Sequence, residues 1–221
     1  MNKEKFLQTY IDIETKVFNK VDKNKKFESL FEDVKTYWKN INSTDILEII
    51  NYLTKTDISI RQPLYKNLIY PILSDQVEKN NIKAIKGLLK LDQHLLSYQG
   101  YTKDYKYSIW TLLEKGLTIE PNDIELLRIY EKKTREYLNY TLHEIPTGVI
   151  YGADGASIEE CEELIEEVSK YEIICNKLKR DENDLIRECK YYYPAYRDYL
   201  SVYKNYENFA DYLEKECLGQ K

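Results

Sequence analysis

The sequence predicts an all-α protein: an antiparallel multi-helix bundle, or an irregular array of helical hairpins, with long helices at the C-terminal end. Charged residues make up 32 % of the 221 residues, whereas glycine occurs only 7 times and proline only 5 times. This composition favours helices over sheets or disorder. Apolar residues recur three and four positions apart in most segments, which is the spacing of one helix face. The third observation is a long heptad pattern after residue 157.

The first segments each carry an apolar stripe at helical spacing. Residues 4–21 repeat it as far as Val17, and residues 27–41 repeat it again, so two helices separated near residues 22–24 are expected. The polar stretch 42–45 supplies a cap for a short third helix.

Proline and asparagine divide the middle of the chain. Pro63 fits the first residue of a helix, and Pro71 is expected to kink or end that helix, because proline lacks an N–H donor. Residues 80–81 are both asparagine and are expected to break the chain before a helix over residues 82–96. The segment 98–110 combines several aromatic residues with only two lysines, so we interpret it as helix packing rather than as a nucleic-acid site.

A turn around Pro121 leads to a helix over residues 123–142, which Asn122 is expected to cap. Residues 143–157 follow as the one extended loop, and this stretch holds three of the seven glycines. Asp154-Gly155 is a sequence typical of a β-hairpin turn. A loop of this length between long helices is expected either to be functional or to join domains.

A heptad pattern organises the last quarter of the chain. We call the seam the seventeen positions reached from Cys161 by alternating steps of three and four residues; sixteen of them are apolar, aromatic or cysteine. This pattern predicts long helices packed side by side, either within one chain or between two copies. The seam positions are Cys161, Leu164, Val168, Tyr171, Cys175, Leu178, Glu182, Leu185, Cys189, Tyr192, Tyr196, Tyr199, Tyr203, Tyr206, Ala210, Leu213 and Cys217.

These helices have identifiable ends. Ser157 and Glu160 have the spacing of a capping box at the first helix start. The polar run 179–184 and Pro194 are both expected to interrupt the helix. Two or three helices are therefore predicted, with one helix or two over residues 158–193.

The length of the chain is sufficient for one domain with a proper core. We expect an N-terminal helical bundle over residues 1–142, the loop over 143–157, and long helices over 158–221 packed on the bundle. These parts are expected to form one structural domain overall.

Charge is unevenly distributed along the chain, whose net charge is −5. Residues 1–115 contain 19 basic and 15 acidic residues, and residues 116–221 contain 14 basic and 23 acidic residues. The acidic half disfavours nucleic acid or an anionic membrane as its partner and favours a cationic surface. The first residues lack the apolar core of a signal peptide, and the longest run without Asp, Glu, Lys or Arg has ten residues, so we expect a soluble, cytoplasmic protein.

All four cysteines lie on the seam, at separations of 14, 14 and 28 residues. Fourteen residues of continuous helix extend about 21 Å, which is too far for a disulfide or a shared metal. A helical hairpin could nevertheless bring two of the cysteines together. We expect buried, unreactive thiols in a reducing compartment.

The residues that usually bind metals or phosphates are sparse. The two histidines, His94 and His143, belong to no metal-binding motif. The glycines of the loop match no nucleotide fingerprint, and the helix after them begins with six glutamates in nine residues, which would repel an anion. No metal or cofactor is therefore expected.

Two sets of residues are candidates for function. In the loop, His143, Glu144 and Asp154 could form an acid–base site if the loop folds back, although a histidine at a helix C-terminus is also a favourable cap. The second set comprises the glutamates and tyrosines of the last quarter, as a surface for a partner, with internal packing as the default interpretation of the tyrosines. Its members are Glu159, Glu160, Glu163, Glu166, Glu167, Tyr196, Tyr199 and Tyr203.

The function that we favour from the sequence is non-enzymatic protein binding by an acidic, tyrosine-rich helical surface. Its most concrete form is a cytoplasmic bacterial immunity protein that neutralises a toxin domain with a basic surface. One alternative is an enzyme with a hydrolase-type acid–base site in the loop. Another is a helical-repeat scaffold or adaptor that forms homo-oligomers, such as a homodimer, through the seam.

Overall fold

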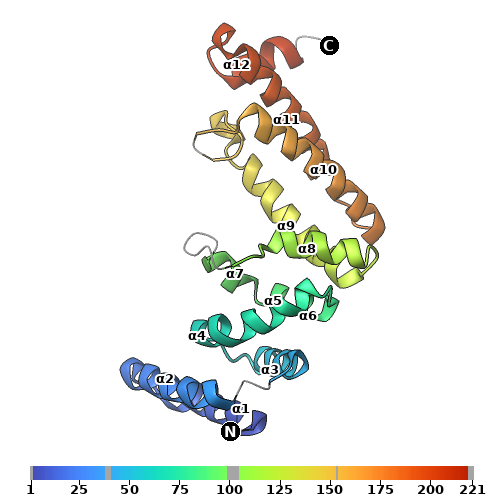
Figure 1. Cartoon of the computed structure of the whole chain (residues 1–221). Coiled ribbons are helices and arrows are strands. Elements are labelled where there is room, and N and C mark those ends of the chain that lie inside the picture. Colours follow the sequence, from blue (N-terminus) through green and yellow to red (C-terminus); the bar gives the residue numbers. More distant parts are fainter. Residues whose placement is uncertain (1, 38–40, 99–104, 153, 219–221) are drawn as a thin grey trace. The chain divides into compact units, whose positions relative to one another are not determined.

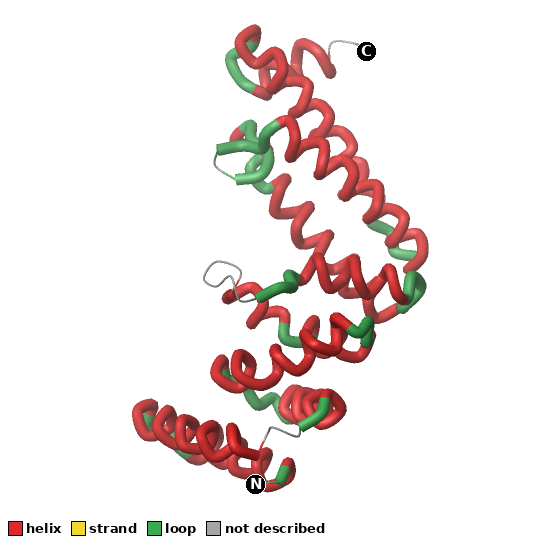
Figure 2. The backbone as a smooth tube through the Cα atoms, viewed as in Figure 1, coloured by secondary structure: helices red, strands yellow, loops and turns green. Residues whose placement is uncertain are grey.

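A computed structural model describes residues 2–37, 41–98, 105–152 and 154–218. All regular secondary structure in these ranges is helical, and none of it is strand (Figures 1 and 2). The predicted all-α fold class is therefore confirmed. None of the helices in these ranges combines the length and apolar character required of a bilayer-spanning segment.

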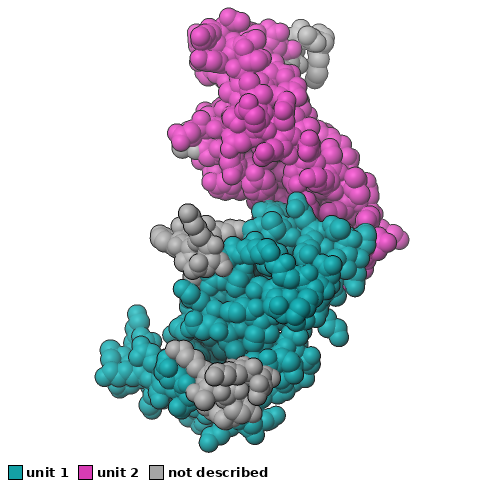
Figure 3. Space-filling model, viewed as in Figure 1, with its two compact units in different colours: residues 1–121 teal, residues 122–221 magenta. Residues whose placement is uncertain are grey.

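The chain divides into two compact units, residues 1–121 and residues 122–221 (Figure 3). The helix that was grouped above with the N-terminal bundle, over residues 123–142, falls within the second unit by its contacts. By sequence, the first unit contains 19 basic and 16 acidic residues, and the second contains 14 basic and 22 acidic residues.

The first unit is a succession of short helices around an aliphatic and aromatic core. Asparagine side chains cap α1, α3 and α6 by accepting backbone N–H groups of the first turn. The core includes Ile49, Leu53, Tyr65, Ile69 and Leu73, all fully buried. The elements are α1 (Lys3–Lys16), α2 (Lys20–Tyr37), α3 (Ser43–Lys55), α4 (Gln62–Leu64), the π-helical turn η2 (Tyr65–Ile69), α5 (Tyr70–Glu78), α6 (Ile82–Leu89), α7 (Asp92–Tyr98) and α8 (Ile109–Ile119).

The first two helices form a hairpin whose turn differs from the prediction. The turn lies at residues 17–19 instead of 22–24, because Asn19 starts α2: its Oδ1 accepts from the backbone N–H groups of Val21 and Asp22 at 2.9 and 3.1 Å. The sequence contained this signal, an asparagine directly before a helical run. The earlier turn leaves Phe18 exposed between the helices.

Two further expectations about the first unit need correction. Residues 82–96 form two helices, α6 and α7, rather than one. Pro71 does interrupt α-helical hydrogen bonding, but through the π-helical turn η2 that precedes it, and the proline itself lies in the first turn of α5.

The second unit is built around one helical hairpin and a third helix. Its elements are α9 (Ile124–Leu142), the 3-10 turn η3 (Ile145–Thr147), α10 (Ile158–Leu178), α11 (Asn183–Val202), the 3-10 turn η4 (Tyr203–Asn205), α12 (Phe209–Tyr212) and the π-helical turn η5 (Leu213–Leu218). α10 packs against both α11 and α9. Asp123, one residue later than expected, caps α9 by accepting from Leu126 N–H at 3.0 Å.

The break predicted at the polar run is confirmed, whereas the break predicted at Pro194 is wrong. α10 ends where Lys179 adopts a left-handed conformation (φ 53°), and α11 begins at Asn183. α11 then continues through Pro194 to Val202. Loss of one hydrogen bond and the ring clash cost about 3 kcal/mol in a helix interior. The buried side chains before and after the proline offset this cost.

The seam describes α10 well but α11 only in part. In α10 every buried side chain except Ile174 is a seam position. In α11 the seam residues Cys189 and Tyr196 are buried, but so are Ile186 and Tyr193, which are not seam positions. Tyr193 is fully buried, and the seam residue Tyr192 is only half-buried. A repeat counted across the turn between the helices therefore holds only in part, because the buried side of α11 is shifted toward Ile186 and Tyr193.

The loop over residues 143–157 folds back on its own unit instead of extending. Tyr151 N–H donates to Thr141 O at 3.0 Å, and Ala156 N–H donates to Ile150 O at 2.6 Å. Ile150 is fully buried in the core of the unit. The described residues of this loop form no β-hairpin, because the apolar residue at its centre is used for packing.

The three cysteines whose side chains are described, Cys161, Cys175 and Cys189, are free and buried; the side chain of Cys217 lies outside the described part of the chain. Burial raises the pKa of Cys161 and of Cys189 to about 11.

An unfolded thiol ionises near pH 8.5, roughly, and only the thiolate reacts. Native protein at pH 8.5 is therefore expected to react with maleimide far more slowly at these three thiols than denatured protein, which should show four. Rapid native labelling of two or more of the three, located by peptide mapping, would contradict the buried interior.

Candidate functional site

Helix α10 begins with a complete capping box. Glu160 N–H donates to Ser157 Oγ at 3.1 Å, and Ser157 N–H donates to Glu160 Oε2 at 2.7 Å. The carboxylate of Glu160 also lies at the positive end of the helix dipole. This glutamate, one of the predicted partner-binding residues, therefore has a structural role.

Glu167 is likewise used inside the unit. Its Oε1 accepts from Tyr130 Oη at 2.6 Å and from Thr134 Oγ1 at 3.3 Å, both on α9. Lys170 Nζ lies 3.9 Å from the other carboxylate oxygen. The side chain is only 19 % exposed, so Glu167 joins α10 to α9 and is poorly available to a partner.

The remaining glutamates of the first three turns face solvent. We call Glu159, Glu162, Glu163 and Glu166 the acidic face; all four are exposed. Within the described part of the chain, Glu159, Glu163 and Glu166 have neither a hydrogen bond nor an ion pair. Glu162 is close enough to Arg197 of α11 to raise the pKa of that guanidinium, after the larger contribution of Asp198.

An exposed apolar side chain follows the acidic face along the same helix. Ile173 is 58 % exposed, and it lies seven residues, about two turns, beyond Glu166 on the same side. The opposite side of α10 is buried through Leu164, Val168 and Tyr171. The outer side of α10 therefore combines a row of carboxylates with one aliphatic contact point.

The predicted tyrosines separate into packing residues and one exposed residue. Tyr196 is buried, with its ring centroid 5.0 Å from that of Phe209 of α12 in an edge-on contact. Tyr199 is half-buried against the same phenylalanine at 5.4 Å. Tyr203 is 52 % exposed. The default interpretation, internal packing, holds for the first two, and only Tyr203 is available on the surface.

The loop candidates are brought together only in part. His143 ends α9 and its ring stacks on Tyr140, with centroids 4.9 Å apart. Its Nε2 lies 2.9 Å from Glu144 Oε1, and Thr147 Oγ1 donates to the other Glu144 oxygen at 3.2 Å. Asp154 is exposed and contacts neither residue by a hydrogen bond or ion pair.

A histidine–carboxylate pair can transfer a proton, but a hydrolase-type site also needs a nucleophile in contact with the base. In the described ranges, the ring nitrogens of His143 contact only Glu144 and the carbonyl of Tyr140. The arrangement is that of a helix C-terminal cap.

The other histidine lies in the first unit and is a packing residue. His94 is 8 % exposed and stacks on Tyr65 at 4.7 Å, with Nδ1 2.7 Å from Gln62 Oε1. Burial lowers its pKa. No group of three or more His, Cys, Asp or Glu side chains suited to a metal occurs among the residues that the structure describes.

Comparison of the chain with protein-family models, with curated proteins and with solved structures found no match.

Proposed function

We propose that the protein acts by non-enzymatic binding of another protein through the acidic face of α10, and that the partner presents a basic surface. The observation that supports this proposal is the difference between the glutamates of one helix. Glu160 and Glu167 have partners within the unit, whereas Glu159, Glu163 and Glu166 are exposed and have none among the residues that the structure describes. A bacterial immunity protein that neutralises a basic toxin domain is the concrete form of this function.

The energetics of the helix support a role for these charges in binding. Like charges three and four residues apart destabilise a helix by a few tenths of a kcal/mol for each pair, about 0.2–0.5. The helix dipole offsets this cost only in the first turn. Lysine or arginine side chains of a partner would remove the repulsion. Charges at such an interface increase the association rate and select the partner more than they increase affinity.

The test is the triple variant Glu159→Gln, Glu163→Gln and Glu166→Gln. Because these side chains are exposed and have no partner in the described part of the chain, the melting temperature of the variant should equal or slightly exceed that of the wild type. The partner is first identified by affinity capture from lysate and mass spectrometry. The association rate of the purified partner should then fall about tenfold at low salt, and its salt dependence should be largely lost.

The matched control is Glu167→Gln, which removes one charge from the same helix but from an inward-facing position. It should lower stability, because Tyr130 and Thr134 lose a charged acceptor, and leave the association rate nearly unchanged. If the triple variant binds at the wild-type rate with the wild-type salt dependence, the interface lies elsewhere, and the exposed Tyr203 is the next candidate.

A further inference from the structure

The turn between α1 and α2 carries the most exposed large apolar side chain of the described chain. Phe18 is 91 % exposed and Val21 is 62 % exposed. The hairpin itself is well anchored: Tyr10 and Phe27 pack at 5.0 Å, and Arg61 donates two hydrogen bonds to Glu14 Oε2, at 2.8 and 3.0 Å. The exposure of Phe18 is therefore not explained by a loosely packed hairpin.

The same turn is strongly basic. We call residues 16–26 the hairpin tip; it contains five lysines and one aspartate. Lys16 pairs with Asp12 at 2.8 Å, and Lys23 donates to the carbonyl of Glu14 at 2.7 Å. The other three, Lys20, Lys25 and Lys26, are exposed and have no ion pair among the described residues.

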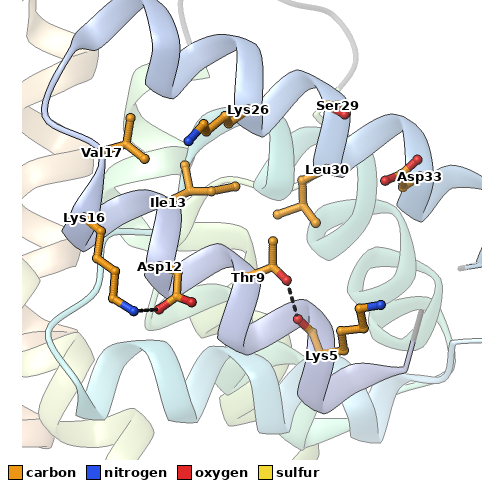
Figure 4. A pocket seen from close by; sticks show the side chains of 10 residues that line it. All are labelled: Lys5, Thr9, Asp12, Ile13, Lys16, Val17, Lys26, Ser29, Leu30 and Asp33. Atoms are coloured by element: carbon orange, nitrogen blue, oxygen red, sulfur yellow. Dashed lines mark hydrogen bonds and ion pairs between the residues drawn. The ribbon is translucent and has the colours of Figure 1, made fainter.

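A groove opens directly beside the tip. It has a volume of about 860 Å³ and lies between α1 and α2 (Figure 4). Lys16 from α1, Val17 from the turn and Lys26 from α2 line its end next to the turn. Apolar and cationic groups are thus interleaved on both sides of the turn.

We propose that the hairpin tip docks on an anionic lipid surface. Phe18 and Val21 enter the boundary between headgroups and acyl chains, and Lys20, Lys25 and Lys26 contact acidic headgroups. An amphipathic element of this kind inserts its apolar residues about 5–10 Å into that boundary. Each lysine near an anionic leaflet contributes about a fivefold increase in affinity.

The shape of the tip favours lipid over a protein partner. Phe18 projects from the end of a hairpin, and lipid can part around a projecting side chain, whereas a protein would need a pocket of matching shape.

The expectation of no membrane partner derives from the acidic half of the chain. The tip belongs to the first unit, which is not acidic: it contains 19 basic and 16 acidic residues. The proposed contact is attachment to one leaflet of the membrane. The hairpin tip is a different surface from the acidic face.

The experiment is co-sedimentation of the full chain with phosphatidylcholine vesicles that contain phosphatidylserine, and with vesicles of phosphatidylcholine alone. The wild type should bind only the vesicles with phosphatidylserine, and more weakly as salt is raised. Phe18→Ser should reduce binding about tenfold. The triple variant Lys20→Gln, Lys25→Gln and Lys26→Gln should reduce it about a hundredfold.

Two control variants separate the tip from general charge and hydrophobicity. The triple variant Lys55→Gln, Lys66→Gln and Lys83→Gln removes the same charge from exposed sites elsewhere in the first unit. Ile173→Ser removes an exposed apolar residue in the second unit. Both should bind like the wild type, and circular dichroism should show unchanged helicity in all variants.

The proposal is overturned if the wild type does not bind the vesicles with phosphatidylserine, or if the two lysine triples lose binding equally. It is also overturned if the wild type fails to bind vesicles but self-associates in analytical ultracentrifugation and Phe18→Ser abolishes that association. In that case the tip contacts a second copy of this chain. None of these results bears on the acidic face.

Discussion

Replacing Gly155 by alanine is expected to destabilise the second unit by about 3 kcal/mol. Gly155 has φ +76°, and a β-carbon built there would lie 2.4 Å from the hydroxyl oxygen of Tyr196. The left-handed conformation alone costs a residue with a β-carbon about 1–2 kcal/mol, and displacing a buried side chain costs a further 1–3 kcal/mol, roughly. Urea unfolding monitored by circular dichroism measures the total loss in the free energy of unfolding.

Two matched variants separate these contributions. Gly152 has nearly the same backbone angle, φ +80°, but a β-carbon at this position would meet no atom within 4 Å, so Gly152→Ala should lose only about 1–2 kcal/mol. Tyr196→Phe removes the clashing oxygen, and in this background Gly155→Ala should cost about as much as Gly152→Ala. Equal losses for the two glycine variants in the wild-type background would show that the loop does not pack on Tyr196.

Replacing Tyr193 by alanine is expected to cost about 4 kcal/mol, the usual range for a large buried aromatic side chain. Its ring is fully buried, and its hydroxyl lies 2.5 Å from Thr141 Oγ1 on α9 and 3.3 Å from the Cys189 thiol, which donates to it. Tyr193→Phe, which keeps the ring, should cost only about 1 kcal/mol, because Thr141 still donates to Leu138 O.

The neighbouring residue provides the control. Tyr192 is half-buried and rests edge-on against Tyr191 at 5.0 Å, so Tyr192→Ala should cost about 1 kcal/mol. The heptad seam predicts the opposite order, since it places Tyr192 inside. A larger loss for Tyr192→Ala than for Tyr193→Ala in denaturant unfolding would restore the seam register to α11.

Local sequence signals were sufficient for prediction where a single capping residue determines where a helix begins. The capping box of Ser157 and Glu160, the polar stretch 42–45 and the break at residues 80–81 predicted helix starts that the structure confirms, with Asn42 and Asn81 as the capping residues of the latter two. The same kind of signal at Asn19 was present and was outweighed by a longer apolar stripe. The first residue of a helix was thus predictable where its capping side chain was recognised.

Features that depend on contacts between distant residues were not predictable. Nothing in the sequence near Pro194 shows that α11 has enough buried surface on both sides to continue through it. The heptad pattern also did not indicate that the turn at Lys179 shifts the register of the buried residues in α11.

The candidate surface was likewise predictable only in part. Helical spacing alone placed Glu163 and Glu166 outward, but only the position of α9 shows that Glu167 has hydroxyl partners. The exposure of Phe18 likewise depends on where one turn falls.

The π-helical turn at Tyr65–Ile69 has a consequence for insertions and deletions. Tyr70 N–H donates to Tyr65 O, five residues back, so this turn contains one residue more than an α-helical turn. Removing one residue there would restore α-helical spacing without shortening the helix by a full turn. Because the wide turn takes up the extra residue locally, its removal leaves the residues before and after it in nearly the same relative orientation, whereas a deletion inside an α-helix rotates the preceding residues by about 100°. Leu64 and Leu73, both buried, would therefore still face the same core. Within these continuous helices, the turn that holds the exposed Lys66 and Asn67 is therefore the position where the chain can lose one residue with the least change in core packing.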